Sequence, residues 1–130
     1  MEQNFGKKEK LKSKKIIEQL FQEGKSVKNY PIRLIYIKLP EDQKTKFQAG
    51  VSVPKRIVKT AVQRNRIKRL LREVYRKNKY LVSNSLSSSY AFMFIYISPE
   101  ELRYEALFAK MEKLLEKFKE KEKWEIQQEK

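Results

Sequence analysis

The chain has 130 residues, 40% of them hydrophobic, which suits the core of a single domain. Its 31 Lys and Arg against 16 Asp and Glu give a net charge of +15, which favours a polyanionic partner such as nucleic acid. The absence of cysteine excludes disulfides and thiolate metal sites, and the absence of histidine removes the commonest general base.

Residues 1–12 are polar and lysine-rich, so they are predicted to form a flexible basic N-terminus. No apolar signal segment or membrane span is apparent, so we expect a cytoplasmic protein with no membrane partner. Ser13 is suited to cap a helix over Lys14–Glu23, which Gly24 would end. The helix carries an apolar stripe made of Ile16, Ile17, Leu20 and Phe21.

A strand is predicted over residues 32–38, with Ile32, Leu34 and Tyr36 on one face and Arg33, Ile35 and Ile37 on the other. Pro40–Lys44 reads as a polar turn, and Lys46–Val53 as the antiparallel partner strand. Two interpretations of Tyr36 stay open. With Arg33 it could stack on single-stranded RNA, or it could be a core residue with a wet hydroxyl.

A basic amphipathic helix is predicted from about Thr60 to Lys79, with Ile67, Leu70, Leu71 and Val74 as its apolar stripe. Residues 55–79 hold eleven Lys and Arg but one acid, Glu73, so they carry +10. A solvated helix would mix both signs, and arginine suits bidentate phosphate contacts, so the polar face is predicted to bind a polyanion. That face carries Arg64, Asn65, Lys68, Arg69, Arg72 and Arg76.

Three further segments complete the chain. Residues 78–89 read as a serine-rich loop, and Tyr90–Ile97 as a central strand buried on both faces. Ser98 and Pro99 are predicted to start a last helix, whose apolar stripe ends at Phe118. The resulting domain spans 13–118, followed by a charged tail over 119–130. We therefore predict an α+β fold, an α-β sandwich in which helices pack on a small mixed sheet.

Residues 61–69, AVQRNRIKR, and the following Arg72-Glu73 resemble the RNR signature of bacterial ribonuclease P protein subunits. Residues 50–56, GVSVPKR, resemble the strand-to-helix entry of that family. The resemblance covers roughly Lys10 to Phe118. It implies a ribosomal-S5-like fold, and an endoribonuclease whose RNA subunit removes the 5′ leader of precursor tRNA.

The resemblance also implies partners and site residues. The partners are the catalytic RNA and precursor tRNA, with Mg²⁺ bound chiefly by RNA and no obligate protein partner. No catalytic or metal-ligating residue is predicted in the protein. The catalytic RNA would be held by Arg64, Asn65, Arg66, Lys68, Arg69 and Arg72. The leader would be contacted by Ile17, Phe21, Arg33, Tyr36, Lys55 and Arg56.

Two other functions belong to different classes. A ribosomal protein that only packs ribosomal RNA would share the fold, so the fold alone does not separate the two. A sequence-specific DNA-binding protein is disfavoured, because no second helix is placed to form a helix-turn-helix.

Overall fold

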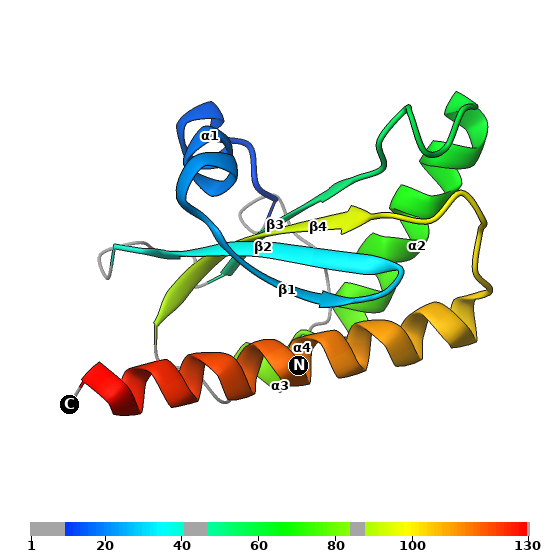
Figure 1. Cartoon of the computed structure of the whole chain (residues 1–130). Helices are drawn as coiled ribbons and strands as arrows, with labels where there is room; N and C mark the ends of the chain where they lie inside the picture. Colours follow the sequence, from blue (N-terminus) through cyan, green and yellow to red (C-terminus); the bar gives the residue numbers. More distant parts are fainter. Residues whose placement is uncertain (1–9, 41–46, 84–87, 130) are drawn as a thin grey trace.

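A four-stranded sheet in the order β1-β2-β4-β3 separates one short helix from two longer ones in the computed structural model (Figure 1). The structure describes residues 10–40, 47–83 and 88–129. The elements are α1 (Lys14–Glu23), β1 (Lys25–Asn29), β2 (Ile32–Leu39), β3 (Phe47–Ser52), α2 (Ala61–Asn78), α3 (Tyr80–Ser83), β4 (Ser89–Tyr96) and α4 (Tyr104–Glu129). This arrangement confirms the predicted α+β class.

The sheet is mixed, as predicted, but one of its pairings was predicted wrongly. β3 lies beside β4 and runs parallel to it, whereas the sequence suggested an antiparallel pair with β2. The pairing places the ring of Phe47 in stacked contact with Tyr90 and Phe92, at centroid distances of 6.0 and 5.6 Å. Since parallel neighbours need a long crossover, α2 can connect the two strands.

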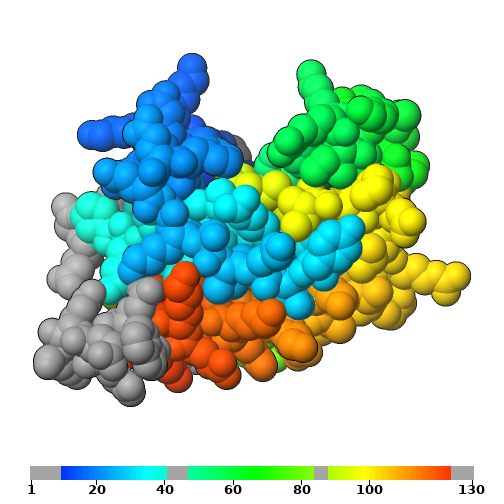
Figure 2. Space-filling view, viewed as in Figure 1, coloured from blue at the N-terminus to red at the C-terminus, as the bar shows by residue number. Residues whose placement is uncertain are grey.

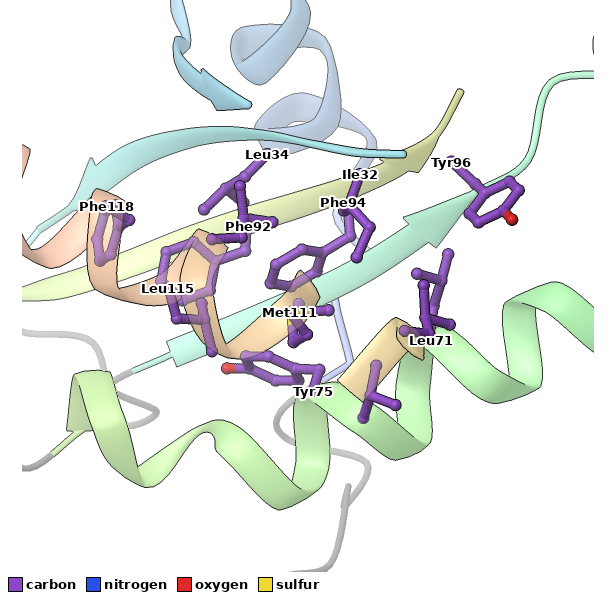
Figure 3. Close-up of a cluster of buried hydrophobic side chains, with 14 of the residues drawn as sticks. Ile32, Leu34, Leu71, Tyr75, Phe92, Phe94, Tyr96, Met111, Leu115 and Phe118 are labelled. Atoms are coloured by element: carbon purple, nitrogen blue, oxygen red, sulfur yellow. The ribbon is translucent and has the colours of Figure 1, made fainter. Parts of the chain in front are cut away.

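β4 is the central strand, and its aromatic side chains form the core, as predicted. Phe92, Phe94 and Tyr96 are fully buried between the sheet and the apolar sides of α2 and α4 (Figure 3). Figure 3 also shows Met111, Leu115 and Phe118 of α4 directed toward the sheet. The amphipathic stripe of the last helix therefore packs as its periodicity indicates.

Three local features differ from the predicted elements. Strand β1 was not predicted, and four residues of the predicted serine-rich loop form α3. The last helix begins at Tyr104 rather than after Ser98, although the Ser98 hydroxyl does accept a hydrogen bond from the amide of Glu100. The Tyr96 hydroxyl donates to the Glu100 carbonyl and accepts from the Leu102 amide, which holds residues 98–102 in a non-helical connection.

Some predictions lie outside the described residues. These are most of the flexible N-terminus (1–9), residues 41–44 of the predicted turn, the first residue of the strand predicted from Lys46, and residues 84–87 of the serine-rich segment. Lys10 forms an isolated parallel bridge with Ala49, and the Leu11 amide donates to the Ala49 carbonyl at 3.0 Å. α4 continues through the predicted charged tail as far as Glu129. No helix in the described part of the chain is both long and apolar enough to cross a membrane.

The two faces of the sheet are covered unequally. α4 and α2 cover one face, whereas α1 covers only part of the other, where Leu20 packs with Ile35 and Met93 (Figure 1). The rest of that second face lies open between α1 and the N-terminal half of α2. This uncovered part of the sheet is the floor of the candidate site.

Candidate nucleic-acid interface

Helix α2 presents its charged side to solvent because its apolar side is anchored in the core. Ile67, Leu71 and Val74 are at most 1% exposed. The Thr60 hydroxyl caps the helix by accepting from the Gln63 amide at 3.3 Å. The first turn of the helix contains no acidic residue, so the positive end of the helix dipole adds to the side-chain charge.

The six residues predicted to contact the catalytic RNA all lie on α2, but their side chains are exposed to different extents. Asn65, Arg66, Arg69 and Arg72 are exposed, whereas Arg64 and Lys68 are half-buried. We refer to the exposed basic residues Arg66, Arg69 and Arg72 as the arginine front.

The arginines of the signature make different contacts. Arg64 donates from Nη1 to the carbonyls of Val58 at 2.9 Å and Lys59 at 3.0 Å. Arg66 pairs with Glu101 through Nε at 3.2 Å and Nη2 at 3.1 Å. Within the described residues, Arg69 and Arg72 make no hydrogen bond or ion pair, so their guanidinium groups are the most available to phosphate.

A shallow hollow of about 190 Å³ lies along the same side of α2. It is lined by Arg69, Arg72, Glu73 and Arg76. Arg76 Nε donates to Glu73 Oε1 at 3.0 Å, so the only carboxylate of the hollow is already paired. The hollow can therefore take an anionic group, for which flat arginine side chains are well suited.

A larger groove of about 460 Å³ crosses the open face of the sheet. Figure 2 shows this hollow between α1 in dark blue and the N-terminal part of α2 in green. Its lining combines basic and apolar side chains: Lys10, Leu11, Lys12, Ile17, Ala49, Gly50, Val51, Arg72 and Met93. Such a lining suits a strand that has both phosphates and bases.

Five of the six residues predicted to contact the leader are at least partly accessible to solvent, and one of them, Ile17, lines this groove. Ile17 lines the groove, and Phe21 follows one turn later on α1 with 56% of its surface exposed. Arg33 is exposed on the same face of the sheet as Ile35, which packs under α1. Lys55 and Arg56 are exposed in the turn that follows β3.

Tyr36 is the exception, and its assignment to the leader side is wrong. It is 1% exposed, and its ring meets Phe118 of α4 edge-on at 4.7 Å. Alternation along β2 correctly grouped it with Ile32 and Leu34, but this group faces α4 rather than the groove. The core interpretation of Tyr36 is therefore right, except that its hydroxyl is buried rather than in contact with water.

The sequence prediction missed Lys10 and Lys12 as groove residues. Both were assigned to a flexible tail, because a run of lysines carries no strand signal. The structure joins this segment to β3 through Lys10 and Leu11, which brings both lysines to the groove. Only the alternation of Lys10, Leu11 and Lys12 could have indicated an extended segment.

Two buried titratable side chains, Tyr96 and Glu122, have hydrogen-bond partners within the protein. Burial raises the pKa of the Tyr96 phenol above its ordinary value. Glu122 is 1% exposed and accepts from the Tyr90 hydroxyl at 2.7 Å. Among the described residues, no group of three or more Asp or Glu side chains is placed to hold a metal ion.

Comparison with known proteins identifies the family. The family model described as Ribonuclease P matches residues 5–119. The ribonuclease P protein component of Porphyromonas gingivalis is 37% identical over 100 residues, which cover 75% of this chain and 73% of that protein. The corresponding protein of Dictyoglomus thermophilum is 32% identical over 118 residues, covering 91% of both chains.

Solved structures agree on the fold. The ribonuclease P protein from Thermotoga maritima superposes with a TM-score of 0.67 at 23% identity, covering 84% of this chain and 96% of that one. The protein from Staphylococcus aureus gives a TM-score of 0.65 at 23% identity, covering 83% and 93%. With most of its length matched by the family model, this chain belongs to the ribonuclease P protein family.

Proposed function

We propose that this chain is the RNA-binding subunit of a ribonuclease P that removes the 5′ leader from precursor tRNA. The arginine front of α2 holds the catalytic RNA, and the groove between α1 and α2 guides the leader. The observation that carries this proposal is the continuity of the two surfaces, because Arg72 lines both the groove and the hollow on α2.

Electrostatics supports binding to the catalytic RNA. Residues 55–79 carry eleven basic side chains and one acid, and the acid is paired with Arg76. Each phosphate neutralised by such a surface releases counterions, so the affinity should depend steeply on salt. This basic surface gives strong attraction with little base discrimination, which suits a partner selected by shape.

The groove supports binding of a single-stranded leader. A single strand exposes both its phosphates and the faces of its bases, and the groove offers lysines together with Ile17 and Met93. Phe21 adds an exposed aromatic ring on α1, and Arg33 adds a cation on the sheet. These groups tolerate different bases, so the leader would be held with little sequence preference.

The chemistry is assigned to the RNA partner. The chain has no histidine or cysteine, and two glutamates near the core or the interface, Glu101 and Glu122, have partners within the protein. Mg²⁺, bound chiefly by RNA, would activate the attacking water and stabilise charge on the phosphate. The protein would bring cationic charge to the complex, lower the Mg²⁺ that it needs, and act in the cytoplasm.

The test measures affinity for the ribonuclease P RNA of the same bacterium over a range of salt concentrations. Arg69→Ala/Arg72→Ala should weaken binding and flatten the slope of log affinity against log salt by about one to two units. Lys110→Ala/Lys113→Ala removes the same charge from exposed positions on α4 and serves as the matched control. An identical loss in both variants would mean that net charge, not the arginine front, determines binding.

A protein that only packs ribosomal RNA is the alternative, since a basic helix on this fold could serve either role. Purification of the tagged full chain from its own bacterium distinguishes them. We expect one RNA of a few hundred nucleotides, separate from ribosomes, that cleaves precursor tRNA at the 5′ end of the mature tRNA. Recovery with ribosomal particles alone would contradict the proposal.

A further inference from the structure

The arginine side of α2 leads directly to an exposed aromatic residue, Tyr80. α2 ends at Asn78, and a single residue, Lys79, separates it from α3. Lys79 keeps an αR backbone, with φ −62° and ψ −21°, so the chain continues its helical winding. At about 100° per residue, Tyr80 projects within roughly 40° of Arg76 and roughly 20° of Arg69. The three side chains therefore follow one side of the rod.

The exposure of Tyr80 contrasts with that of most other tyrosines. Its exposed fraction is 48%, whereas Tyr36, Tyr75, Tyr90 and Tyr96 are at most 1% exposed. α3 turns Val82 into the core instead. Within the described part of the chain, the Tyr80 side chain makes no hydrogen bond and no ring contact. A flat aromatic surface is thus presented to solvent beside a row of cations.

The hollow along α2 indicates which kind of ligand would contact the Tyr80 ring. Arg69 and Arg72 line the hollow with guanidinium groups that have no partner among the described residues, and Arg76 lines its end nearest to Tyr80. Arg76 and Tyr80 are about 6 Å apart along the helix axis. Phosphates held by the arginines and a base lying on Tyr80 could therefore belong to neighbouring nucleotides of one strand.

We propose that Tyr80 is a stacking site for an unpaired nucleobase of the RNA held by the arginine front. This inference rests on the proposed function and adds a feature of the partner. A base within a continuous duplex is covered on both faces by its neighbours, so a side chain can stack only on an unpaired or bulged base or at the end of a duplex. The RNA at the C-terminal end of α2 is therefore not the interior of a continuous duplex, which the arginines alone would accept.

The experiment measures affinity of the full chain for the ribonuclease P RNA, without precursor tRNA, at several salt concentrations. Tyr80→Ala should weaken binding by roughly 5- to 150-fold, which is about 1–3 kcal/mol per stacked base converted at about 1.4 kcal/mol per tenfold. The salt slope should stay unchanged, because no charge is removed. Tyr80→Phe and Tyr80→Trp should keep nearly the original affinity, since each retains an aromatic face.

Tyr30→Ala is the matched control, because Tyr30 is also exposed, at 56%, but follows β1 rather than α2. It should leave the affinity within about twofold. Thermal unfolding and circular dichroism of each variant establish that the compared proteins are folded. Tyr80→Trp keeps the inference testable if the alanine variant folds poorly, because a core role would not tolerate the larger ring.

The outcomes separate this inference from the proposed function. Unchanged affinity in Tyr80→Ala, with a loss in Arg69→Ala/Arg72→Ala, would overturn the stacking site alone. A loss in Tyr80→Phe as large as that in Tyr80→Ala would also overturn it, because the hydroxyl would then carry the contact. If both Tyr80→Ala and Arg69→Ala/Arg72→Ala, tested separately, bind the RNA with the affinity of the wild type, the proposed function is overturned as well. Loss of a co-purifying protein, with unchanged RNA affinity, would assign Tyr80 to a protein partner and overturn the inference.

Discussion

The Arg64 guanidinium lies between two backbone carbonyls, those of Val58 at 2.9 Å and Lys59 at 3.0 Å. The first arginine of the signature therefore closes the turn between β3 and α2. The turn itself is hydrogen-bonded, with the Pro54 carbonyl accepting from the amides of Ile57 and Val58. Because Lys55, Arg56 and Lys59 are exposed on this turn, Arg64 fixes the position of cations other than its own.

We therefore expect Arg64→Ala to loosen the turn in the free protein. Amide hydrogen exchange of residues 55–59 should become faster, because a locally held segment opens more easily once its contact is lost. Arg69→Ala removes the same charge but no internal hydrogen bond, so it should leave that exchange unchanged. Equal exchange in the wild type and in Arg64→Ala would show that Arg64 has no positioning role.

Gly24 is required for space rather than for an unusual backbone angle. Its φ of −64° and ψ of 143° are open to any residue. A Cβ there, however, would lie 2.2 Å from the Leu20 carbonyl oxygen and 2.4 Å from Ile35 Cγ2. We expect Gly24→Ala to lower the free energy of unfolding by about 1–3 kcal/mol, as overpacking does.

Gly50→Ala provides the comparison for that measurement. The nearest atom to its Cβ would be Met93 Cε at 3.3 Å, the mobile end of a flexible side chain. Urea unfolding should therefore show a much smaller loss in the free energy of unfolding for Gly50→Ala than for Gly24→Ala. A similar change at both positions would contradict the steric argument.

The elements predicted correctly are those whose periodicity matches their burial. The stripes of α1 and α2, and the apolar run of β4, identify their buried sides from sequence alone. Strand β1, with the sequence KSVKN, has little apolar content. It is held partly by α4, since Lys117 and Lys121 donate to the carbonyls of Lys28 and Ser26 at 3.2 and 3.0 Å. Contacts so distant in sequence leave no local pattern.

The errors at the site have a related cause. Alternation along β2 separates two faces, but it does not say which face a helix will cover, and so Tyr36 was assigned to the leader side. The turn predicted after β2 favoured a hairpin with β3, yet stacking of Phe47 on β4 accompanies the parallel arrangement. By contrast, the six predicted α2 residues lie on one helix, as the periodicity indicated, although Arg64 and Lys68 are half-buried there.

The buried Tyr96 hydroxyl should make stability fall at high pH. Burial raises the pKa of this phenol above its usual value of about 10, so above pH 10 the unfolded chain releases a proton that the folded chain retains. The protonated Tyr96 phenol contributes fully to the free energy of unfolding below pH 10. This contribution is lost as the pH rises through the folded-state pKa of the phenol. At pH 7, Tyr96→Phe should lower stability by about 0.5–1.5 kcal/mol per lost hydrogen bond.

Urea unfolding of both proteins from pH 7 to pH 11 provides the measurement. The difference in the free energy of unfolding between wild type and Tyr96→Phe should become smaller above pH 10, because phenylalanine has no proton to release. Comparing the two proteins cancels the titration of the other tyrosines and the lysines. A difference that stays constant up to pH 11 would argue against a buried, protonated Tyr96.

Phe21 and Tyr36 should respond to alanine in opposite ways. Phe21 is mostly exposed, so Phe21→Ala should change stability little but weaken the holoenzyme's binding of precursor tRNA by roughly 1–3 kcal/mol for one stacked base. Mature tRNA, which has no leader, should bind as before. Tyr36→Ala empties a core position and should lower the free energy of unfolding by about 3–5 kcal/mol. Equal losses for precursor and mature tRNA in Phe21→Ala would remove Phe21 from the leader path.

The last prediction concerns the residues that perform the chemistry. A protein nuclease needs a general base, or carboxylates that present a metal-activated water to the phosphate. Glu122 is the strongest protein candidate, because it is buried and accepts a hydrogen bond from Tyr90. Glu101 is the carboxylate paired with the arginine front, through Arg66. Both side chains can be changed to the amide with little change in shape.

If the RNA carries the chemistry, the purified protein alone should cleave no precursor tRNA, with or without Mg²⁺. Together with its RNA it should support cleavage at low Mg²⁺, because the protein's positive charge replaces part of the cation screening. In that holoenzyme, Glu122→Gln and Glu101→Gln should each leave the single-turnover cleavage rate within about tenfold, or roughly 1.4 kcal/mol of activation free energy. A glutamine variant that binds both RNAs normally but no longer cleaves would make the protein the catalyst, since only a group acting on the reacting atoms produces that combination.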